Sequence, residues 1–485
     1  MNSITELSPV EVWKHFYALT KIPRPSKFEA AAADYILEFG KSLGLESIKD
    51  EIGNVIIRKP ATPGMEDRMG IILQAHVDMV PQKNSDVEFD FRKDAIQPRI
   101  VGDLVYATGT TLGADDGLGC AVAMAVLESK DMVHGPIEAF ITVDEETGMT
   151  GARNVKPGVI KGDILINLDS ETEGELYVGC AGGLDAAAEF TYTTEAVPVG
   201  YKGFKVSVTG LVGGHSGMDI ILYRANANKV MARVLLPILR DLDAKLIQVE
   251  GGNMRNAIPR EAFAIIAISE DKVEAAKAII ADKLKALKDE YAATDKDINV
   301  DIVEEEVKEE AICSKVAINL CKALYACPNG VERMSDAMPG LVETSNNMAI
   351  VKSANGKINI YSLMRSSVDS AKEDLMERMR SVFELAGAEV TFTGGYSGWA
   401  PNMASPILKE MKAVYNKLYG KEPAVMAIHA GLECGILGGI YPNWDMISCG
   451  PTIFSPHSPD ERVNIESVAK WWKFVVEVLK EAPKK

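Results

Sequence analysis

The chain has 485 residues, of which 47% are hydrophobic and 25% charged, and its formal net charge is −17 at pH 7. This length exceeds one compact core and predicts two or three domains of about 150 residues each. The negative charge argues against an electrostatic grip on nucleic acid or on an anionic membrane. No apolar stretch reaches the about 18 residues of a membrane span. The seven scattered cysteines include no CxxC pair, so we expect a cytoplasmic protein with free thiols.

The first part of the chain, residues 1–186, alternates helical and strand-like segments. Helical periodicity runs through KFEAAAADYILEFGKSLGL, and the short apolar runs GIILQAHVDMV and GDILINLDS are typical of buried strands. The segment DDGLGCAVAMAVLES reads as a helix with an aspartate at its start. This alternation predicts an α/β domain whose sheet is mostly parallel and flanked by helices.

The middle of the chain, residues 187–394, follows a different pattern. Strand candidates such as FKVSVTG, AFAIIAIS and KINIYSLMR separate long charged helices, for example EDKVEAAKAIIADKLKALKDEYAA. Compact apolar strands and Gly-rich turns return after GGYSGWAP and continue through residues 395–485. We therefore expect one α/β domain built from residues 1–186 and 395–485, with an α+β domain of residues 187–394 inserted into it.

Ionisable side chains follow the apolar runs of the α/β domain at the point where each run ends. In open α/β sheets, ligands bind in the crevice beyond the carboxyl ends of the strands, so these groups are expected to converge. They are His76 and Asp78 after IILQA, Asp144, Glu145 and Glu146 after IEAFITV, Asp169 after DILINL, His457 in the loop after DMIS, and Asp115 and Asp116 at the start of a predicted helix.

Two imidazoles and several carboxylates without a cysteine suit Zn²⁺ or a similar divalent ion. The cluster offers five candidate ligands and further carboxylates, more than one ion needs. It therefore predicts two ions bridged by one carboxylate. Asp78 lies two residues after His76 and would hold this imidazole by its other nitrogen. Because adjacent residues of an extended chain point apart, one of Glu145 and Glu146 can bind metal while the other takes a proton from metal-activated water.

Each of these fragments also has an ordinary explanation. An HxD triplet is more often incidental, and a Glu-Glu pair is usually surface charge in a solvated turn. Asp115 would serve equally well as a helix cap. The metal site is favoured because all the fragments occupy the same kind of position in the predicted sheet.

The segments AHVDMVP, TLGADDGLG, DEETGMTGA, NLDSE and PHSPDERV together resemble the co-catalytic zinc metallopeptidases, the family that includes carnosinases, aminoacylases and carboxypeptidase G. The matches occur in order and span the whole chain. The resemblance is strongest to the bacterial dipeptidases of this family that cleave Xaa-His. The length of the chain and its inserted middle domain agree with that group.

The resemblance implies two Zn²⁺ ions per active site, with Co²⁺ or Mn²⁺ as substitutes. The ligands it assigns are His76 and Asp169 for one ion, Glu146 and His457 for the other, and Asp115 as the bridge between them. Glu145 would be the general base, and Asp78 would support His76. A cis peptide bond is implied between Asp115 and Asp116.

The resemblance also makes the middle domain a lid. His215 in VTGLVGGHSGMD would stabilise the oxyanion of the tetrahedral intermediate. Asn256 in GGNMRNAIP would donate a hydrogen bond near the scissile carbonyl. Arg365 is a candidate for the terminal carboxylate of the substrate, since a guanidinium fork fits it; a surface salt bridge is the alternative. The Gly-rich segment AIHAGLECG contains His429 and Glu433, and we place it in the α/β domain. Glu433 either receives a free α-amino group of the substrate or has a structural role.

The function implied by the resemblance is a cytoplasmic zinc dipeptidase that acts on Xaa-His and other unblocked dipeptides, of the β-alanyl-histidine type. A homodimer formed through the lid is the expected assembly. An N-acyl amino acid deacylase or an aminopeptidase of the same fold is the alternative enzyme. A non-catalytic metal-binding protein is a further alternative. The presence of every expected ligand and of the base Glu145 argues against it.

Overall fold

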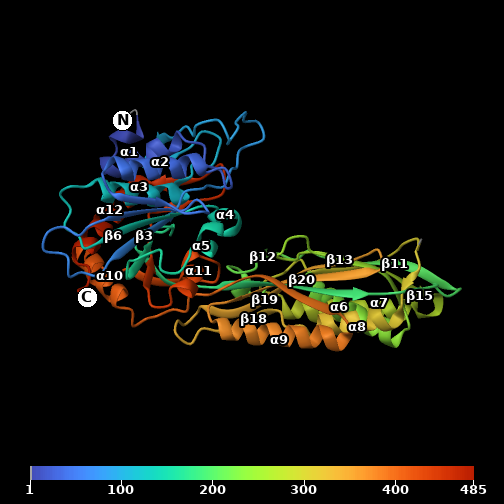
Figure 1. Cartoon of the computed structure of the whole chain (residues 1–485). Coiled ribbons are helices and arrows are strands. Elements are labelled where there is room, and N and C mark those ends of the chain that lie inside the picture. Colours follow the sequence, from blue (N-terminus) through green and yellow to red (C-terminus); the bar gives the residue numbers. More distant parts are fainter. Residues whose placement is uncertain (1–2, 308) are drawn as a thin grey trace. The chain divides into compact units, whose positions relative to one another are not determined.

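A computed structural model of the chain describes residues 3–307 and 309–485. The chain divides into two units, coloured along the sequence in Figure 1. Unit 1 consists of Met1–Cys180, Trp399–Ala427 and Leu432–Lys485, and unit 2 of Ala181–Gly398 and Ile428–Gly431. Unit 2 is thus an insertion into unit 1, and its main borders lie near those predicted from the change of sequence pattern.

The central sheet of unit 1 explains the continuous apolar runs of the sequence. Its third, fourth and fifth strands in spatial order are buried along their whole length and pair in parallel. The spatial order is β1 (Glu46–Lys49), β2 (Val55–Lys59), β6 (Ile137–Thr142), β3 (Ile71–His76), β7 (Ile164–Asn167), β23 (Asp445–Ser448), β8 (Glu175–Cys180) and β22 (Ala424–Ile428).

A smaller sheet of unit 1 joins distant parts of the chain. It contains, in spatial order, β24 (Ile453–Phe454), β25 (Arg462–Asn464), β5 (Leu104–Tyr106) and β4 (Arg99–Val101). The pairing of β25 with β5 sets Val463 opposite Val105. The loop between β24 and β25 is thereby anchored to the region that leads from β5 into the next helix.

The helices of unit 1 pack on this framework, and α1, α2 and α3 lie together on one side of β3 and β6 (Figure 1). Helix α3 is buried from Ala114 to Leu127 because it packs between α1 and β3, which explains its apolar composition all round. The bounds are α1 (Val10–Thr20), α2 (Ala30–Ser42), α3 (Ala114–Glu128), α4 (Glu145–Gly148), α5 (Thr150–Asn154), α10 (Pro406–Tyr419), α11 (Glu433–Ile440) and α12 (Ile465–Lys480), with a short 3₁₀ helix at Ile4–Glu6.

Unit 2 is built on a second, antiparallel sheet. Its spatial order is β16 (Asn299–Glu304), β11 (Tyr201–Thr209), β15 (Ala262–Ser269), β13 (Lys245–Gly251), β19 (Val342–Ala354), β20 (Lys357–Ser366), β9 (Gly182–Thr191) and β21 (Glu389–Tyr396), and β18 (Gly330–Met334) pairs with β19. Two short ladders join β10 (Thr194–Glu195) to β17 (Ala311–Ile312) and β12 (Gly214–His215) to β14 (Ala257–Ile258).

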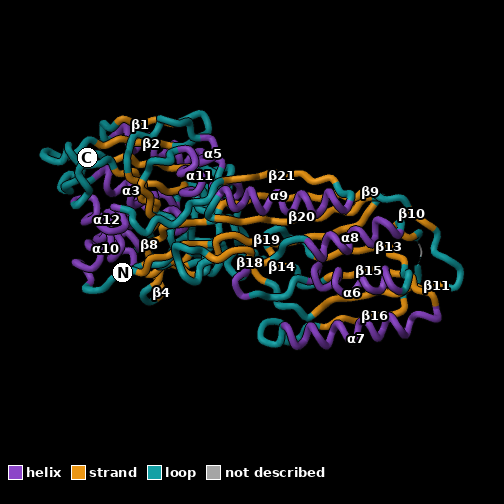
Figure 2. Tube along the Cα trace, turned by 90° about the horizontal axis from the view of Figure 1, so that it is seen from below, coloured by secondary structure: helices purple, strands orange, loops and turns teal. Residues whose placement is uncertain are grey.

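Long helices run alongside the strands of unit 2, as Figure 2 shows, and Figure 1 places them on one side of the sheet. They are α6 (Ala227–Asp241), α7 (Val273–Glu290), α8 (Ser314–Ala326) and α9 (Asp369–Ala386), with 3₁₀ helices at Ile220–Leu222 and Glu270–Lys272. Burial alternates along β11 and much of β20, which is the pattern of a sheet covered on one face. Among the described residues, no helix of either unit is both long enough and apolar enough to span a bilayer.

Candidate active site

Three neighbouring strands of unit 1 bring predicted ligands to one edge of the sheet. His76 is the last residue of β3, Glu146 follows β6, and Asp169 follows β7. Parallel strands end at the same edge, which is why these side chains meet. Asp115 at the start of α3 and His457 between β24 and β25 complete the group, since the pairing of β5 with β25 brings their loops together.

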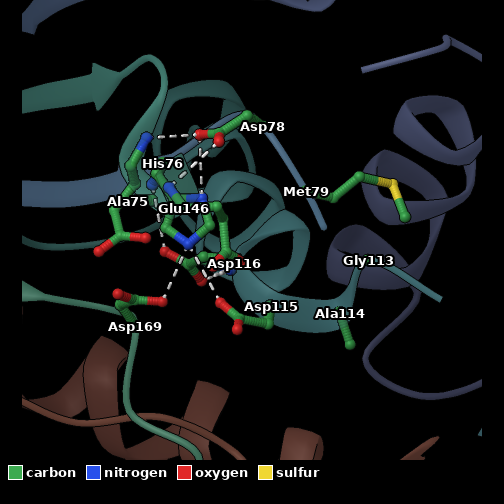
Figure 3. Close-up of polar contacts among 12 residues, drawn as sticks. Ala75, His76, Asp78, Met79, Gly113, Ala114, Asp115, Asp116, Glu146 and Asp169 are labelled. Atoms are coloured by element: carbon green, nitrogen blue, oxygen red, sulfur yellow. Dashed lines mark hydrogen bonds and ion pairs between the residues drawn. The ribbon is translucent and has the colours of Figure 1, made fainter. Parts of the chain in front are cut away.

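The Asp115 carboxylate lies between the two histidines. Its Oδ1 is 3.1 Å from Nε2 of His76, and its Oδ2 is 3.0 Å from Nε2 of His457. Each histidine has one further carboxylate: Oδ1 of Asp169 lies 3.3 Å from Nε2 of His76, and Oε2 of Glu146 lies 3.1 Å from Nε2 of His457. The site therefore has two halves that share Asp115, and Figure 3 shows the half around His76.

These residues fit a divalent metal ion. His76, Asp115 and Glu146 offer ligand atoms that all lie within 4.8 Å of one another. The buried Oε1 of Glu146 has no hydrogen-bond partner among the described residues, although such an atom normally has one. Imidazole nitrogens and carboxylate oxygens without sulfur are donors suited to zinc and similar ions. Coordination would satisfy the unpartnered oxygen and offset the crowded negative charge.

Burial and neighbouring charges set the proton affinity of the cluster. Burial raises the pKa of Asp115, but hydrogen bonds from the two histidines outweigh it and hold the pKa well below its usual range. Hydrogen bonds to Asp115 and Glu146 raise the pKa of His457 to about 11. Burial, assisted by nearby carboxylates, raises the pKa of Glu145 well above its usual range. A bound cation would lower each of these pKa values.

Asp78 supports both the histidine and the acidic pair. Its Oδ1 lies 3.4 Å from Nδ1 of His76, as expected for a carboxylate that orients a ligating imidazole. The same carboxylate accepts hydrogen bonds from the backbone N–H groups of Glu145 at 3.0 Å and of Glu146 at 3.3 Å. Asp78 is completely buried, so its geometry is fixed from all sides.

The Glu145-Glu146 pair is not extended, and this part of the sequence interpretation is wrong. Asp144 adopts a left-handed backbone conformation with φ of 53°, and α4 begins directly after it at Glu145. The two side chains diverge because neighbouring residues of a helical turn do not face each other. The different roles predicted for the two glutamates are therefore compatible with the helical turn.

The start of α3 differs from a simple capped helix. Gly113 is the N-cap residue, no side chain caps the helix there, and Asp115 and Asp116 have non-helical backbone angles. Asp115 faces the histidines, so the helix-cap alternative is wrong for it. Asp116 instead accepts a hydrogen bond from the backbone N–H of Gly119 at 3.0 Å. The peptide bond between Asp115 and Asp116 is cis, as the resemblance implied.

A second polar cluster, the Gly217 cluster, lies within unit 2. A Cβ on Gly217 would lie 3.2 Å from Cε1 of His215, 3.3 Å from Nε of Arg365 and 2.3 Å from the backbone oxygen of His429. Nδ1 of His215 accepts the backbone N–H groups of Gly217 at 3.2 Å and Met218 at 3.1 Å. The ring hydrogen must therefore sit on Nε2, which is free to donate. Burial and then the charge of Arg365 lower the pKa of His215, which keeps the ring neutral.

Arg365 and Asn256 belong to the same cluster. Arg365 is only 6% exposed, and its Nη2 lies 3.5 Å from Oγ of Ser216. Its Nε has no hydrogen-bond partner among residues 3–307 and 309–485, so the alternative of a surface salt bridge is wrong. The backbone N–H of Ser216 donates to the backbone oxygen of Asn256 at 2.8 Å, which ties Asn256 to the segment of His215.

Glu433 lies outside this cluster, at the start of α11 in unit 1. It is completely buried, and its Oε2 accepts hydrogen bonds from Gln74 at 2.6 Å and Thr142 at 2.7 Å. Burial raises its pKa to about 7. Its role towards a substrate amino group stays a prediction. His429, expected in the same domain as Glu433, belongs instead to unit 2.

The sequence interpretation missed two buried charged residues that hold the loop before α3. Arg24 is 2% exposed and donates hydrogen bonds to the backbone oxygens of residues 77–78 and of Gly113. Glu461, also 2% exposed, accepts hydrogen bonds from the backbone N–H groups of residues 112–115. Glu461 lies within the motif PHSPDERV, but its backbone partners leave no signal in the sequence.

Proteins of one peptidase family resemble this chain over most or all of its length. Residues 72–481 match the model of Peptidase family M20/M25/M40. The cytosol non-specific dipeptidase of Escherichia coli (strain K12) is 45% identical over 485 residues, which cover 100% of both chains. The crystal structure of aminoacylhistidine dipeptidase from Vibrio alginolyticus is 46% identical, with a TM-score of 0.95 over 100% of this chain and 99% of that chain.

More distant structures share the fold. The aminopeptidase PepT from Bacillus cereus is 18% identical and superimposes with a TM-score of 0.58 over 98% of this chain and 99% of that chain. The family match and the full-length identities together confirm the resemblance predicted from the five sequence motifs. The chain therefore belongs to peptidase family M20/M25/M40 and is a hydrolase that acts on peptide bonds.

Proposed function

We propose that this chain is a metal-dependent dipeptidase that hydrolyses unblocked dipeptides, Xaa-His among them. The observation that carries the proposal is the Asp115 carboxylate, whose two oxygens face His76 at 3.1 Å and His457 at 3.0 Å. A carboxylate shared in this way is suited to bridge two cations. Two relatives that match over the full length, at 45% and 46% identity, are named dipeptidases.

Two Zn²⁺ ions, or Co²⁺ or Mn²⁺ as substitutes, would be held by the two halves of the site. The ligands are His76 and Asp169 in one half, Glu146 and His457 in the other, and Asp115 in both. Bound ions supply Lewis acidity for the peptide carbonyl and lower the pKa of water. Asp78 keeps His76 in the orientation that this coordination needs.

Glu145 acts as the general base and then as the general acid. It takes the proton of the attacking water and returns it to the leaving amine. Its backbone is fixed by the hydrogen bond from its N–H to Asp78 at 3.0 Å. Its carboxylate makes none of the close contacts to the two histidines that the ligands make, in the part of the chain that the structure describes, which leaves it available for proton transfer.

The Gly217 cluster of unit 2 supplies the groups that recognise the substrate. Nε2–H of the neutral His215 donates to the oxyanion, and Asn256 donates near the scissile carbonyl. Arg365 receives the terminal carboxylate through its guanidinium group, whose Nε–H has no hydrogen-bond partner among the described residues. This assignment favours short substrates with a free carboxylate.

Location and assembly complete the proposal. The Escherichia coli relative is named a cytosol dipeptidase, and we propose the cytoplasm for this chain as well. A homodimer formed through unit 2 stays a prediction from the sequence. Sedimentation of the purified protein measures its oligomeric state and tests this prediction.

The test is hydrolysis by purified protein that has been stripped with a chelator and reloaded with Zn²⁺. We expect zinc-dependent release of histidine from β-alanyl-histidine and cleavage of leucyl-glycine, with N-acetyl amino acids left intact. Glu145→Gln should lower kcat by about 10²–10⁴-fold while zinc remains bound. Glu51→Gln, which removes an exposed carboxylate paired with Lys156, is the matched control and should leave kcat unchanged.

Two other outcomes would contradict the proposal. Cleavage of the N-acetyl substrates alone would make the protein a deacylase of the same fold and remove the argument for a free amino end. Failure to cleave any substrate with zinc bound would make it a metal-binding protein without peptidase activity.

A further inference from the structure

Glu461 is a buried carboxylate that faces a row of backbone N–H groups. Its Oε2 accepts hydrogen bonds from Leu112 at 2.7 Å and Gly113 at 2.9 Å, and its Oε1 from Ala114 at 2.7 Å and Asp115 at 3.3 Å. These four amides compensate the burial of the Glu461 carboxylate, which is 2% exposed. Successive amides that point at one anion form a strong binding nest.

This nest joins two loops that each carry a ligand of the proposed metal centre. Asp115 is the last of the four donors, and His457 lies four positions before Glu461, in the loop between β24 and β25. The Glu461 side chain therefore cross-links the loop of the bridging carboxylate to the loop of His457. Arg24 holds the same Asp115 loop from its other side, through the backbone oxygen of Gly113.

The two halves of the site depend on this cross-link to different degrees. His76 ends β3 and Asp169 follows β7, and these two strands are fixed to each other by a parallel ladder. His457 has no such support: its backbone is left-handed with φ of 58°, and its side chain is 50% exposed. Glu146 lies in the four-residue helix α4. Loss of the cross-link should therefore affect the half with Glu146 and His457 first.

We propose that Glu461 is a positioning residue that sets the affinity of the site for the second metal ion, the one assigned to Glu146 and His457. It does so by holding the Asp115 and His457 loops in one frame, and the inference rests on the proposed metal centre. Glutamine at this position would turn its NH₂ group towards two of the backbone N–H donors and leave them unpaired. The loops would separate where the nest is broken.

The experiment compares full-length variants that have been stripped of metal and titrated with Co²⁺. Visible absorption follows binding, and mass spectrometry of desalted samples counts the bound ions. The wild type should bind two ions, and Glu461→Gln should keep the first but bind the second about 10–100-fold more weakly. Asp460→Asn removes the same charge from the exposed neighbouring residue in the same loop, and it should bind both ions like the wild type.

A double variant separates selective positioning from general damage. Glu146→Gln removes a ligand of the second ion directly, so it should match Glu461→Gln, and the two changes together should still retain one ion. Glu461→Asp keeps the charge with a shorter reach. It should fold, as judged by circular dichroism of the metal-free protein, and should weaken the second ion by a smaller factor.

Each remaining outcome decides against the inference. Equal affinities in the wild type and Glu461→Gln would overturn the role of Glu461 and leave the proposed function standing. Loss of both ions in Glu461→Gln or in the double variant would make Glu461 a general support of the fold. A wild type that binds no metal would overturn the inference together with the proposed function.

Discussion

At the scale of single residues, His429 couples the stability of unit 2 to pH. It is 6% exposed, and its Nε2 lies 2.7 Å from Oγ of Ser345. Burial, followed by the charge of Arg365, lowers its pKa to about 3. The unfolded chain keeps an imidazole pKa of about 6.5 and binds the proton first as the pH falls. The free energy of unfolding should therefore decrease from pH 6.5 towards pH 3, by up to about 1.4 kcal/mol per pH unit.

The variant His429→Gln tests this dependence because it keeps a polar group beside Ser345 but cannot titrate. Between pH 7.5 and pH 5.5 the wild type should lose about 1 kcal/mol more unfolding free energy than this variant. Ser345→Ala is the control: it removes the hydrogen bond, lowers stability at both pH values and keeps the pH dependence. Denaturant unfolding at the two pH values measures the difference. An equal loss in the wild type and His429→Gln would contradict the assignment.

The convergence of the candidate metal ligands could be predicted, whereas the contacts of Arg24 and Glu461 that hold their loops could not. His76, Asp115 and His457 can be recognised as candidates in the sequence. Metal-ligating side chains are of only a few types, and in this fold they are expected after strands or at the start of a helix. Arg24 and Glu461 bind backbone atoms of other segments. Any sequence supplies such atoms, so only the path of the folded loops identifies these contacts.

At the scale of elements, the segment after β23 runs directly against the chain that follows β7. A Cβ on Gly450 would lie 1.5 Å from the backbone oxygen of Ser170. No rotamer change can relieve this contact, because the clashing atom belongs to the backbone. Any side chain at Gly450 must therefore move Ser170 and the adjacent Asp169, a ligand of the proposed centre.

Gly450→Ala is expected to lower the free energy of unfolding by about 1–3 kcal/mol, the usual cost of overpacking, and to weaken metal binding at the His76 half of the site. The control is Gly438→Ala in α11, where the new Cβ meets only the flexible end of Met446, at 2.7 Å from Cε. That substitution should be tolerated, since alanine favours a helix over glycine by up to about 1 kcal/mol. Chemical unfolding and zinc content measure both effects. Normal zinc content in Gly450→Ala would refute the link to Asp169.

Long elements with a clear period could be predicted, and short ones held by tertiary contacts could not. The strands β3 and β7 and the helix α7 lie where their apolar patterns predict. Helix α4 has four residues, and Asp78 accepts the N–H groups that begin it. Because that acceptor comes from the segment after β3, the local sequence DEETG predicts an acidic turn but not its conformation.

At the scale of the whole molecule, the insertion of one domain into the other could be read from the change of sequence pattern. The assignment of residues 428–431 to unit 2 could not be predicted from the sequence. The backbone N–H of Ala181 donates to the oxygens of Ile428 at 3.1 Å and Ala430 at 3.0 Å, and His429 contacts Ser345. Four residues are too few to carry a period, so their place depends entirely on these contacts.

All predicted metal ligands belong to unit 1, and this distribution has a thermodynamic consequence. A bound metal ion stabilises only the folded unit that binds it, by about 2.7 kcal/mol when the free ion concentration is one hundred times Kd. Calorimetry of the chelated full-length protein should give two transitions, and zinc should raise one of them by roughly 5–10 °C while the other stays in place. His429→Gln at pH 5.5 should shift the other transition, which assigns it to unit 2, and Glu146→Gln should reduce the zinc shift. If zinc moves both transitions together, the two units unfold as one cooperative body.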